Sequence, residues 1–154
     1  MFQNERNYEP AVEALKPALH NLPGKIVAIT GLPGVGKTSL GRYLAYRFNV
    51  SLIETDLFLR RACGAMEHHE DLIDQVIGTR LDQEDPERQR PVVIEGATVL
   101  RLLDRLGRRP DFIIQVINSD APASNPRLAK ELEGYDAEYT PASAADLFLD
   151  FSAS

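Results

Sequence analysis

Short apolar runs alternate along the chain with segments in which apolar residues recur every three or four positions. The apolar runs predict strands at about 25–30, 50–55, 91–95, 112–117 and 145–150. Helical spacing predicts helices at 37–48, 69–83 and 97–107, and shorter helices at 57–63 and 127–133. Strands that alternate with helices indicate right-handed crossovers, and therefore a mainly parallel five-stranded sheet in a three-layer α/β/α arrangement.

Two further segments flank this pattern. Residues 1–24 are expected to form a helical extension, in which 10–21 has helical spacing and Pro17 should kink or interrupt the helix. Residues 118–126 are rich in Pro, Ser and Asn and predict a loop, which opens a short lid-like segment at 118–140. No repeat or linker divides the chain, so we expect a single domain over 1–154.

Composition narrows the class of protein. The net charge of −6 argues against a general nucleic-acid binder, which needs a basic surface. Cys63 is the only cysteine, so no internal disulfide is expected. The sequence shows no signal peptide and no apolar run long enough to cross a bilayer, so we expect a cytoplasmic protein without a membrane partner. Nothing in the pattern specifies an oligomeric state.

A glycine-rich segment lies between the first predicted strand and the first long predicted helix. It reads Gly31-Leu32-Pro33-Gly34-Val35-Gly36-Lys37-Thr38 and matches the P-loop pattern G-x-x-x-x-G-K-[ST]. Glycines let the backbone curl so that successive N–H groups and a helix N-terminus point at one anion. The pattern predicts that the chain binds a nucleoside triphosphate, with Lys37 reaching its phosphates and Thr38 holding Mg²⁺.

The ends of the other strands distinguish among P-loop proteins. A GTPase needs N-K-x-D after a late strand, and Asn118-Ser119-Asp120 lacks both the lysine and the spacing. A transporter or AAA-type ATPase normally has a strand ending in Asp-Glu and a further domain or signature loop, whereas the third strand here ends Ile94-Glu95-Gly96. These features favour a small-molecule kinase.

The chain resembles the small P-loop kinases of the nucleoside and nucleotide kinase group, and within it the uridine kinase-like branch. The resemblance covers about 25–150 and rests on 31–38, Thr55-Asp56-Leu57-Phe58, Val93-Ile94-Glu95-Gly96, and the pattern Tyr135, Tyr139-Thr140-Pro141, Ala145-Asp146. It implies a P-loop NTPase fold, ATP and Mg²⁺ as cofactors, and transfer of the γ-phosphoryl group to a small-molecule acceptor such as a nucleoside-like hydroxyl. The expected ATP-binding residues are Gly31, Leu32, Pro33, Gly34, Val35, Gly36, Lys37, Thr38 and Ser39.

Two carboxylates are candidates for the chemistry. An acceptor hydroxyl needs an oxygen base within about 3 Å, and Asp56 follows the second strand; the alternative is that Asp56 caps the next helix. Glu95 ends a strand expected to be buried, where an unpaired carboxylate is costly. It is assigned to Mg²⁺ or to a substrate hydroxyl, unless it only pairs with an internal cation. Thr38, Asp56 and Glu95 are the candidate metal ligands.

Arginines near these strand ends are candidates for binding the acceptor. Arg60 and Arg61, with Asp56 and Glu95, form the candidate substrate site, although adjacent arginines on a short helix are usually partly solvated. Arg80 either faces the cleft or complements its helix dipole.

Other basic side chains are expected at the surface. His68 and His69 precede a predicted helix and are read as surface histidines, although binding to an acceptor or a metal is possible in principle. A charge run is usually a solvated face, and the run here is Arg101, Arg105, Arg108 and Arg109.

The segment between the fourth and fifth strands departs from the resemblance, which implies an arginine-rich lid. It has only Arg127 and Lys130 as cations, among Asp120, Glu131, Glu133, Asp136 and Glu138. A net acidic segment clamps phosphate poorly, so either Arg127 alone serves as the lid cation or turnover is slow. Two alternatives therefore stay open: a nucleotide-binding or hydrolysing module without efficient kinase activity, and a nucleic-acid 5′-hydroxyl kinase or other specialised phosphotransferase. The candidate catalytic residues are Lys37, Asp56, Glu95 and Arg127.

Overall fold

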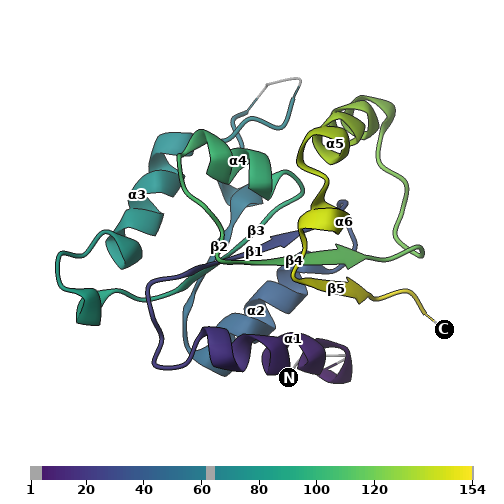
Figure 1. Cartoon of the computed structure of the whole chain (residues 1–154). Coiled ribbons are helices and arrows are strands. Elements are labelled where there is room, and N and C mark those ends of the chain that lie inside the picture. Colours follow the sequence, from purple (N-terminus) through teal and green to yellow (C-terminus); the bar gives the residue numbers. More distant parts are fainter. Residues whose placement is uncertain (1–4, 62–64, 154) are drawn as a thin grey trace.

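Five parallel strands form the centre of the structure (Figure 1). The computed structural model describes residues 5–61 and 65–153. The strands lie in the order β2-β3-β1-β4-β5 and comprise β1 (Ile26–Thr30), β2 (Ser51–Glu54), β3 (Val92–Glu95), β4 (Phe112–Ile117) and β5 (Leu147–Asp150). All pairings within the sheet are parallel, so the sheet expected from the sequence is confirmed.

The central strand β1 determines where the site lies. All five of its residues are buried, and it pairs with β3 on one side and β4 on the other. In this register Ile29 lies opposite Glu95 of β3 and Ile114 of β4. Parallel strands end at the same edge of a sheet, so the loops that follow β1, β2, β3 and β4 meet at one edge.

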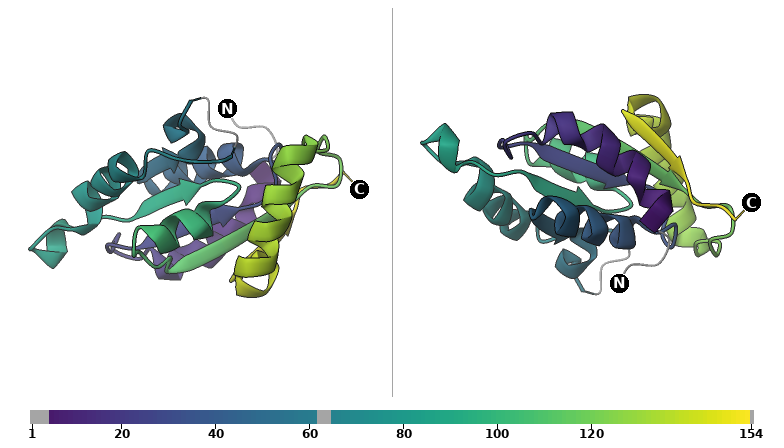
Figure 2. Two further views of the ribbon diagram at one scale, coloured as in Figure 1. Left: turned by 90° about the horizontal axis from the view of Figure 1, so that it is seen from above. Right: turned by 90° about the horizontal axis from the view of Figure 1, so that it is seen from below.

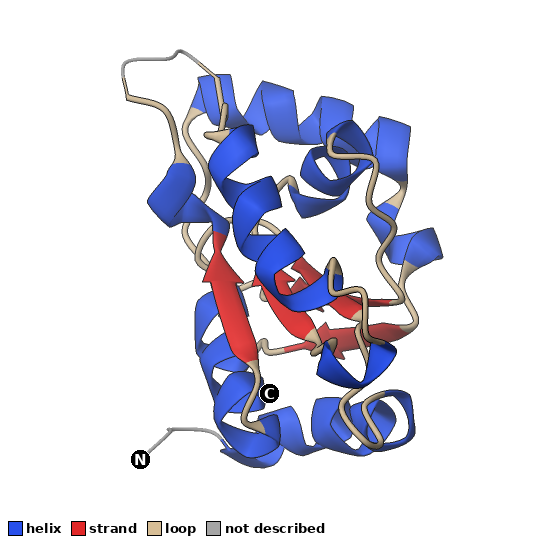
Figure 3. Cartoon of the chain, turned by 90° about the vertical axis from the view of Figure 1, so that its left-hand side faces the viewer, coloured by secondary structure: helices blue, strands red, loops and turns tan. Residues whose placement is uncertain are grey.

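Helices cover both faces of the sheet, as Figure 3 shows from the side. Helices α1 (Glu5–Ala18) and α2 (Lys37–Phe48) lie on one face, and α3 (Glu70–Leu81), α4 (Val99–Arg105) and α5 (Pro126–Tyr139) lie on the other (Figures 1 and 2). Alternate residues of β1 supply the two cores: Val27 and Ile29 pack with α1 and α2, whereas Ile26 and Ala28 pack with α3 and α4. The three-layer α/β/α fold is confirmed.

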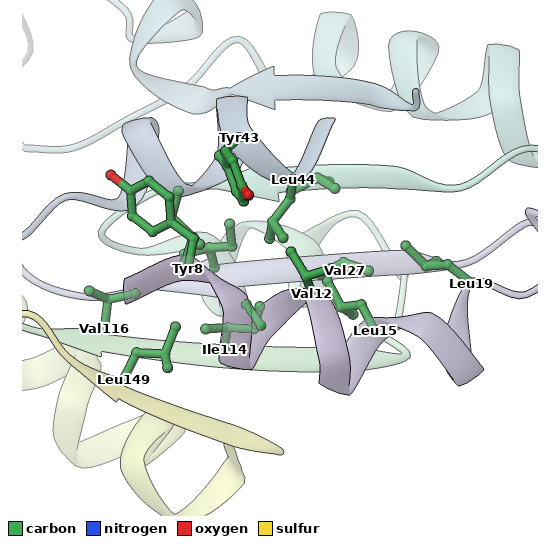
Figure 4. Close-up of a cluster of buried hydrophobic side chains, with 14 of the residues drawn as sticks. Tyr8, Val12, Leu15, Leu19, Val27, Tyr43, Leu44, Ile114, Val116 and Leu149 are labelled. Carbon is green, nitrogen blue, oxygen red and sulfur yellow. The ribbon is translucent and has the colours of Figure 1, made fainter. Parts of the chain in front are cut away.

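Helix α1 covers the part of the sheet that α2 leaves open. Tyr8, Val12 and Leu15 are buried against α2 and against strand residues including Val27 and Ile114 (Figure 4). The Tyr8 ring lies 5.1 Å from the Tyr43 ring and 5.6 Å from the Phe151 ring, centroid to centroid. Opposite the core, Glu9 Oε1 accepts hydrogen bonds from the Tyr43 hydroxyl at 2.8 Å and from Arg47 at 2.7 Å.

The N-terminal helix differs from the expectation. It begins at Glu5 rather than near residue 10, ends at Ala18, and continues through both Pro10 and Pro17. The prediction that Pro17 interrupts it is wrong. Each proline removes one helical hydrogen bond, and both prolines are exposed, so the carbonyls left without partners can face water. Burial of the helix face at Tyr8, Val12 and Leu15 outweighs that cost.

Several element boundaries also differ. The helix expected at 57–63 is a 3₁₀ turn, η1 (Thr55–Phe58), because Leu59 pairs with His68 in an antiparallel bridge; residues 62 and 63 lie outside the described residues. Helix α5 runs over 126–139 instead of 127–133, begins with an Asn125 side-chain cap, and is followed by α6 (Pro141–Ala144). A further 3₁₀ turn, η2 (Pro86–Arg88), precedes β3.

Within 5–61 and 65–153, none of the helices has the length and the apolar character that crossing a membrane requires.

We expect Leu15→Ala to lower the free energy of unfolding by about 2–5 kcal/mol, because Leu15 is fully buried between α1 and the sheet. Urea denaturation followed by circular dichroism measures the change. Lys16→Ala is the matched control, since the Lys16 side chain is exposed and forms only a surface ion pair with Glu13. Equal stabilities of the two variants would show that α1 does not contribute to the core as described.

Candidate active site

The loop between β1 and α2 has the backbone shape that an anion site requires. Gly34 and Gly36 have φ values of 80° and 108°, a region that residues with a Cβ rarely adopt. Gly36 is also the N-cap residue of α2, and its first turn carries no side-chain cap. The N–H groups at this helix start are therefore available to an oxyanion, and the helix dipole adds a partial positive charge.

Lys37 folds back over this loop. Its Nζ donates a hydrogen bond to the Leu32 carbonyl oxygen at 2.8 Å, and the residue is 8% exposed. Burial lowers the pKa of the Lys37 ammonium, and the negative charges of Glu95 and Asp56 oppose that shift. The ammonium therefore lies at the loop, with two carboxylates near enough to influence its ionisation.

Thr38 and Glu95 meet across the ends of β1 and β3. The Thr38 hydroxyl donates a hydrogen bond to Glu95 Oε1 at 2.9 Å, and Glu95 is 2% exposed. Burial raises the pKa of the Glu95 carboxyl, whereas the Thr38 hydrogen bond and the Lys37 charge lower it. Among the described residues, no cation lies within salt-bridge distance of Glu95.

This donor set fits Mg²⁺. A hydroxyl and a carboxylate are hard oxygen ligands, and Mg²⁺ in such sites is usually held by one or two protein oxygens together with phosphate and water. In the described parts of the chain, no cluster of three or more His, Cys, Asp or Glu side chains could hold a metal by itself. Any Mg²⁺ at Thr38 and Glu95 would thus take further ligands such as phosphate oxygens and water.

Asp56 lies in η1, directly after β2. Its side chain is exposed, and its charge acts on the ionisation of Lys37, Glu95 and His68. The N-cap of η1 is Glu54 and no side chain caps that turn, so Asp56 does not have the capping role considered as the alternative. The capping of η1 thus does not occupy its carboxylate, which is exposed to solvent.

The arginines considered as acceptor-binding candidates lie at opposite edges of the sheet. Arg60 and Arg61 are exposed beyond η1, and their side chains form no ion pair with the rest of the described chain. Arg80 donates to Ser51 Oγ at 3.0 Å, at the start of β2 and so at the edge of the sheet opposite the P-loop. That contact excludes a cleft-facing Arg80.

Of the basic residues expected at the surface, His68 is buried and Arg101 is partly buried. His68 is 8% exposed and its Nε2 has no hydrogen-bond partner in the described residues, whereas His69 is exposed as predicted. Burial lowers the pKa of the His68 imidazole, and the Asp56 charge opposes this. The Arg101 side chain is 18% exposed and donates to Glu131 Oε1 at 2.7 Å.

The other three arginines of the run differ in their exposure to solvent. Arg105 is about half exposed, and Arg109 is exposed. Arg108 is largely buried and donates to Asp74 and Asp82, each at 2.7 Å. These hydrogen-bonded carboxylates raise the pKa of the Arg108 guanidinium, which serves to join α3 to the end of α4. The usual solvated face of a charge run is thus not found at Arg101 and Arg108, because their partners come from other elements.

Helix α5 lines two cavities. The larger, about 860 Å³, lies between the P-loop, β4 and α5, and its mostly apolar lining includes Leu32, Tyr135 and Phe148. Gln115 of β4 also lines it, is 9% exposed, and has an Oε1 without a hydrogen-bond partner among the described residues. The smaller cavity, about 460 Å³, lies between residues 65–67, α4 and α5.

The segments after β4 and β5 border the P-loop together. Ser119 bonds to the Ser152 hydroxyl through both its N–H and its own hydroxyl, at 2.8 and 2.9 Å, and the Ala153 N–H donates to Asp120 at 2.6 Å. A Cβ at Gly36 would lie 3.2 Å from the Phe151 ring. Arg127, proposed from the sequence as a lid cation, is exposed in the first turn of α5 and lines the smaller cavity instead.

No family model matches the chain. A structure described as a possible uridine kinase from Bacillus stearothermophilus superposes with a TM-score of 0.66 and 17% identity, covering 96% of this chain and 100% of that one. Shikimate kinase from Acinetobacter baumannii, in complex with shikimate, superposes with a TM-score of 0.50 and 16% identity over 90% of this chain and 89% of that one. The chain therefore has the fold of the small P-loop kinases.

Sequence similarity to curated proteins is confined to a short stretch. A shikimate kinase of Corynebacterium glutamicum is 46% identical over 39 residues, which cover 25% of this chain and 23% of that protein. The match spans about a quarter of either chain, so the acceptor has to be argued from the site.

We expect the stability of the protein to fall as pH drops from about 7.5 to about 5.5, in part because of His68. Its pKa is lowered from 6.5 in the folded state, so the unfolded chain takes up the proton first and acid favours unfolding. Urea denaturation across this range should give a shallower pH dependence for His68→Gln than for the wild type. His20→Gln, at an exposed histidine, is the control. Identical slopes for all three proteins would contradict the buried neutral imidazole.

Proposed function

We propose that this chain is a P-loop kinase that transfers the γ-phosphoryl group of ATP to a hydroxyl group of a small-molecule acceptor. The observation that carries the proposal is the meeting, at one edge of the sheet, of an uncapped helix start, the buried Lys37 and the hydrogen-bonded pair Thr38 and Glu95. The kinase fold of the solved structures supports the same reading.

Binding of the triphosphate is assigned to residues 31–39. The N–H groups at the start of α2 and the Lys37 ammonium surround the phosphate oxygens, so charge that develops in the transition state meets dipoles and a cation already in place. To reach a phosphate, Lys37 Nζ exchanges its present bond to the Leu32 carbonyl for one to the ligand. Mg²⁺, held by Thr38 and Glu95 with the phosphates, supplies further positive charge when bound.

Asp56 is assigned to the acceptor. Its exposed carboxylate accepts a hydrogen bond from the acceptor hydroxyl and orients its oxygen toward the γ-phosphorus. As the new O–P bond forms, the bond between the γ-phosphorus and the β–γ bridging oxygen breaks, the hydroxyl proton passes to Asp56, and ADP leaves. The transfer is mainly a matter of position and charge.

A nucleotide-binding or hydrolysing module remains the second candidate. The observation that favours it is the segment between β4 and β5, in which Arg127 is exposed and forms no ion pair with the described chain. The nucleoside-like acceptor and the cytoplasmic location that the sequence suggests stay predictions. So do the roles of Arg60 and Arg61 in binding the acceptor.

Acceptor-dependent release of ADP distinguishes these candidates. The assay combines purified protein, ATP and Mg²⁺ with neutral nucleosides, nucleotides, sugars and hydroxy acids in turn, and couples ADP to NADH oxidation. A kinase releases ADP faster with at least one acceptor and forms a phosphorylated product. ADP release that no acceptor changes would favour the hydrolysing module and contradict the kinase.

Lys37→Ala should reduce turnover by about 100-fold or more, since it removes the cation at the γ-phosphate. Calorimetric titration with Mg²⁺ and a non-hydrolysable ATP analogue should also show weaker binding. Lys25→Ala, which removes a lysine just before β1, is the control and should behave as the wild type. Unchanged binding and turnover in Lys37→Ala would overturn the assignment of the P-loop.

Asp56→Asn should lower kcat by about 100-fold or more, because the amide keeps the shape of the side chain but cannot take the proton. The Kd for the ATP analogue should stay close to that of the wild type. Asp71→Asn, an exposed acid in the first turn of α3, controls for the loss of one negative charge. If Asp56→Asn retains the full acceptor-dependent rate, Asp56 is not the base.

A further inference from the structure

The smaller cavity is lined mainly by charged side chains. Its walls are residues 65–67, α4 and α5, and it encloses about 460 Å³. Four basic residues line it, against two acidic ones; the basic residues are Arg101, Arg105, Arg127 and Lys130, and the acidic ones are Glu67 and Glu131. A chain with a net charge of −6 therefore concentrates positive charge in one concave place.

Two of the four basic residues, Arg127 and Lys130, form no ion pair within the described residues. Glu131 is already engaged, because its carboxylate accepts from Arg101 at 2.7 Å and from the Met66 N–H at 3.0 and 3.1 Å. Arg105 reaches only Glu70, at 3.5 Å, and Lys130 is exposed with no ion pair in this part of the chain. An anion in the cavity would meet the Arg127 guanidinium and the Lys130 ammonium with no bound carboxylate to displace.

Two walls of the cavity belong to segments that follow the strands ending at the proposed reaction site. Residues 65–67 come from the excursion that follows Asp56, and α4 follows Glu95. The charges of Asp56, Arg101 and Arg105 all act on the ionisation of the buried His68, so the proposed base and the cationic wall both lie within electrostatic range of this one histidine.

We propose that this cavity binds a carboxylate or phosphate group carried by the acceptor, and that the enzyme therefore prefers small anionic hydroxy compounds to neutral ones. The inference rests on the proposed function, because it names the class of acceptor for that site. The volume suits a metabolite-sized group. Arg101 is fixed by Glu131, which leaves Arg105, Arg127 and Lys130 to determine how tightly the anion binds.

Anion binding can be measured without any phosphoryl transfer. The P-loop is first filled with Mg²⁺ and a non-hydrolysable ATP analogue, and inorganic phosphate or malonate is then titrated separately and followed by NMR. We expect saturable binding to the wild type and at least about tenfold weaker binding to Arg105→Gln/Lys130→Gln. Comparison of phosphate with malonate shows which of the two anionic groups the cavity prefers.

The control double variant is Arg88→Gln/Arg109→Gln, which removes the same number of charges from exposed positions outside the cavity and should bind anions as the wild type does. Equal loss of binding in both double variants, or no saturable binding to the wild type, would overturn the proposal. If the analogue itself does not bind, the proposed function fails, and the titration continues on the nucleotide-free protein, where the two double variants still isolate the cavity.

The kinetic counterpart uses the acceptor panel. Arg105→Gln/Lys130→Gln should raise KM at least about tenfold for anionic acceptors, while KM for ATP and for neutral acceptors stays the same. A preference for neutral acceptors in the wild type would contradict the proposed anion site but leave the kinase assignment intact. If the double variant loses anion binding but the wild type transfers phosphate to no acceptor, the anion site is supported and the kinase assignment is contradicted.

Discussion

The parallel pairing of β1 between β3 and β4 is the constraint on which the site depends. Because β1 is buried on both faces and bonded on both sides, its carboxyl end cannot shift without breaking two ladders and two cores. The turn to α2 therefore starts from a fixed point, and Glu95 is held opposite Ile29 by register. The bond from Thr38 to Glu95 follows from this geometry, since it joins the first turn of α2 to the end of the neighbouring strand. A buried carboxylate is tolerated there because a hydroxyl, and on the proposed function a metal ion, satisfies it.

The sequence predicted correctly those elements whose structure is determined by residues within one short segment. The five strands, the parallel sheet and helix α2 were predicted because apolar runs and the glycine-rich turn specify them without reference to distant residues. Glu95 could be identified because burying an unpaired carboxylate at the end of an apolar strand is energetically costly. Helix α1 was only partly predicted, since its prolines argue against a helix and only the packing of Tyr8 and Leu15 on α2 and the sheet shows why it persists.

The surroundings of the acceptor could not be predicted, because they depend on contacts between segments far apart in the chain. In the sequence Arg101 cannot be distinguished from the neighbouring arginines. Only the fold brings Glu131, thirty residues later, within hydrogen-bond distance of it. His68 precedes a helix like a surface residue, yet the antiparallel bridge of its backbone to Leu59 turns it inward. Tyr135 likewise joins three elements, because its hydroxyl bonds to Thr30 at 2.8 Å and accepts from the Leu100 N–H at 3.3 Å. No periodicity in a single segment encodes such pairings.

The acidity of the segment between β4 and β5 takes on a different meaning once α5 is placed. From the sequence, Glu131 counts against phosphate binding, but in the structure its charge is taken up by Arg101 and the Met66 N–H, and it holds one wall of the cationic cavity in position. Glu133 and Asp136 line the larger cavity instead, on another face of the same helix. Helix α5 thus presents Arg127, Lys130 and the already paired Glu131 to one cavity, and Glu133 and Asp136 to the other. Net charge over a segment is therefore a poor guide to function here, because a helix distributes its charges over faces that meet different neighbours.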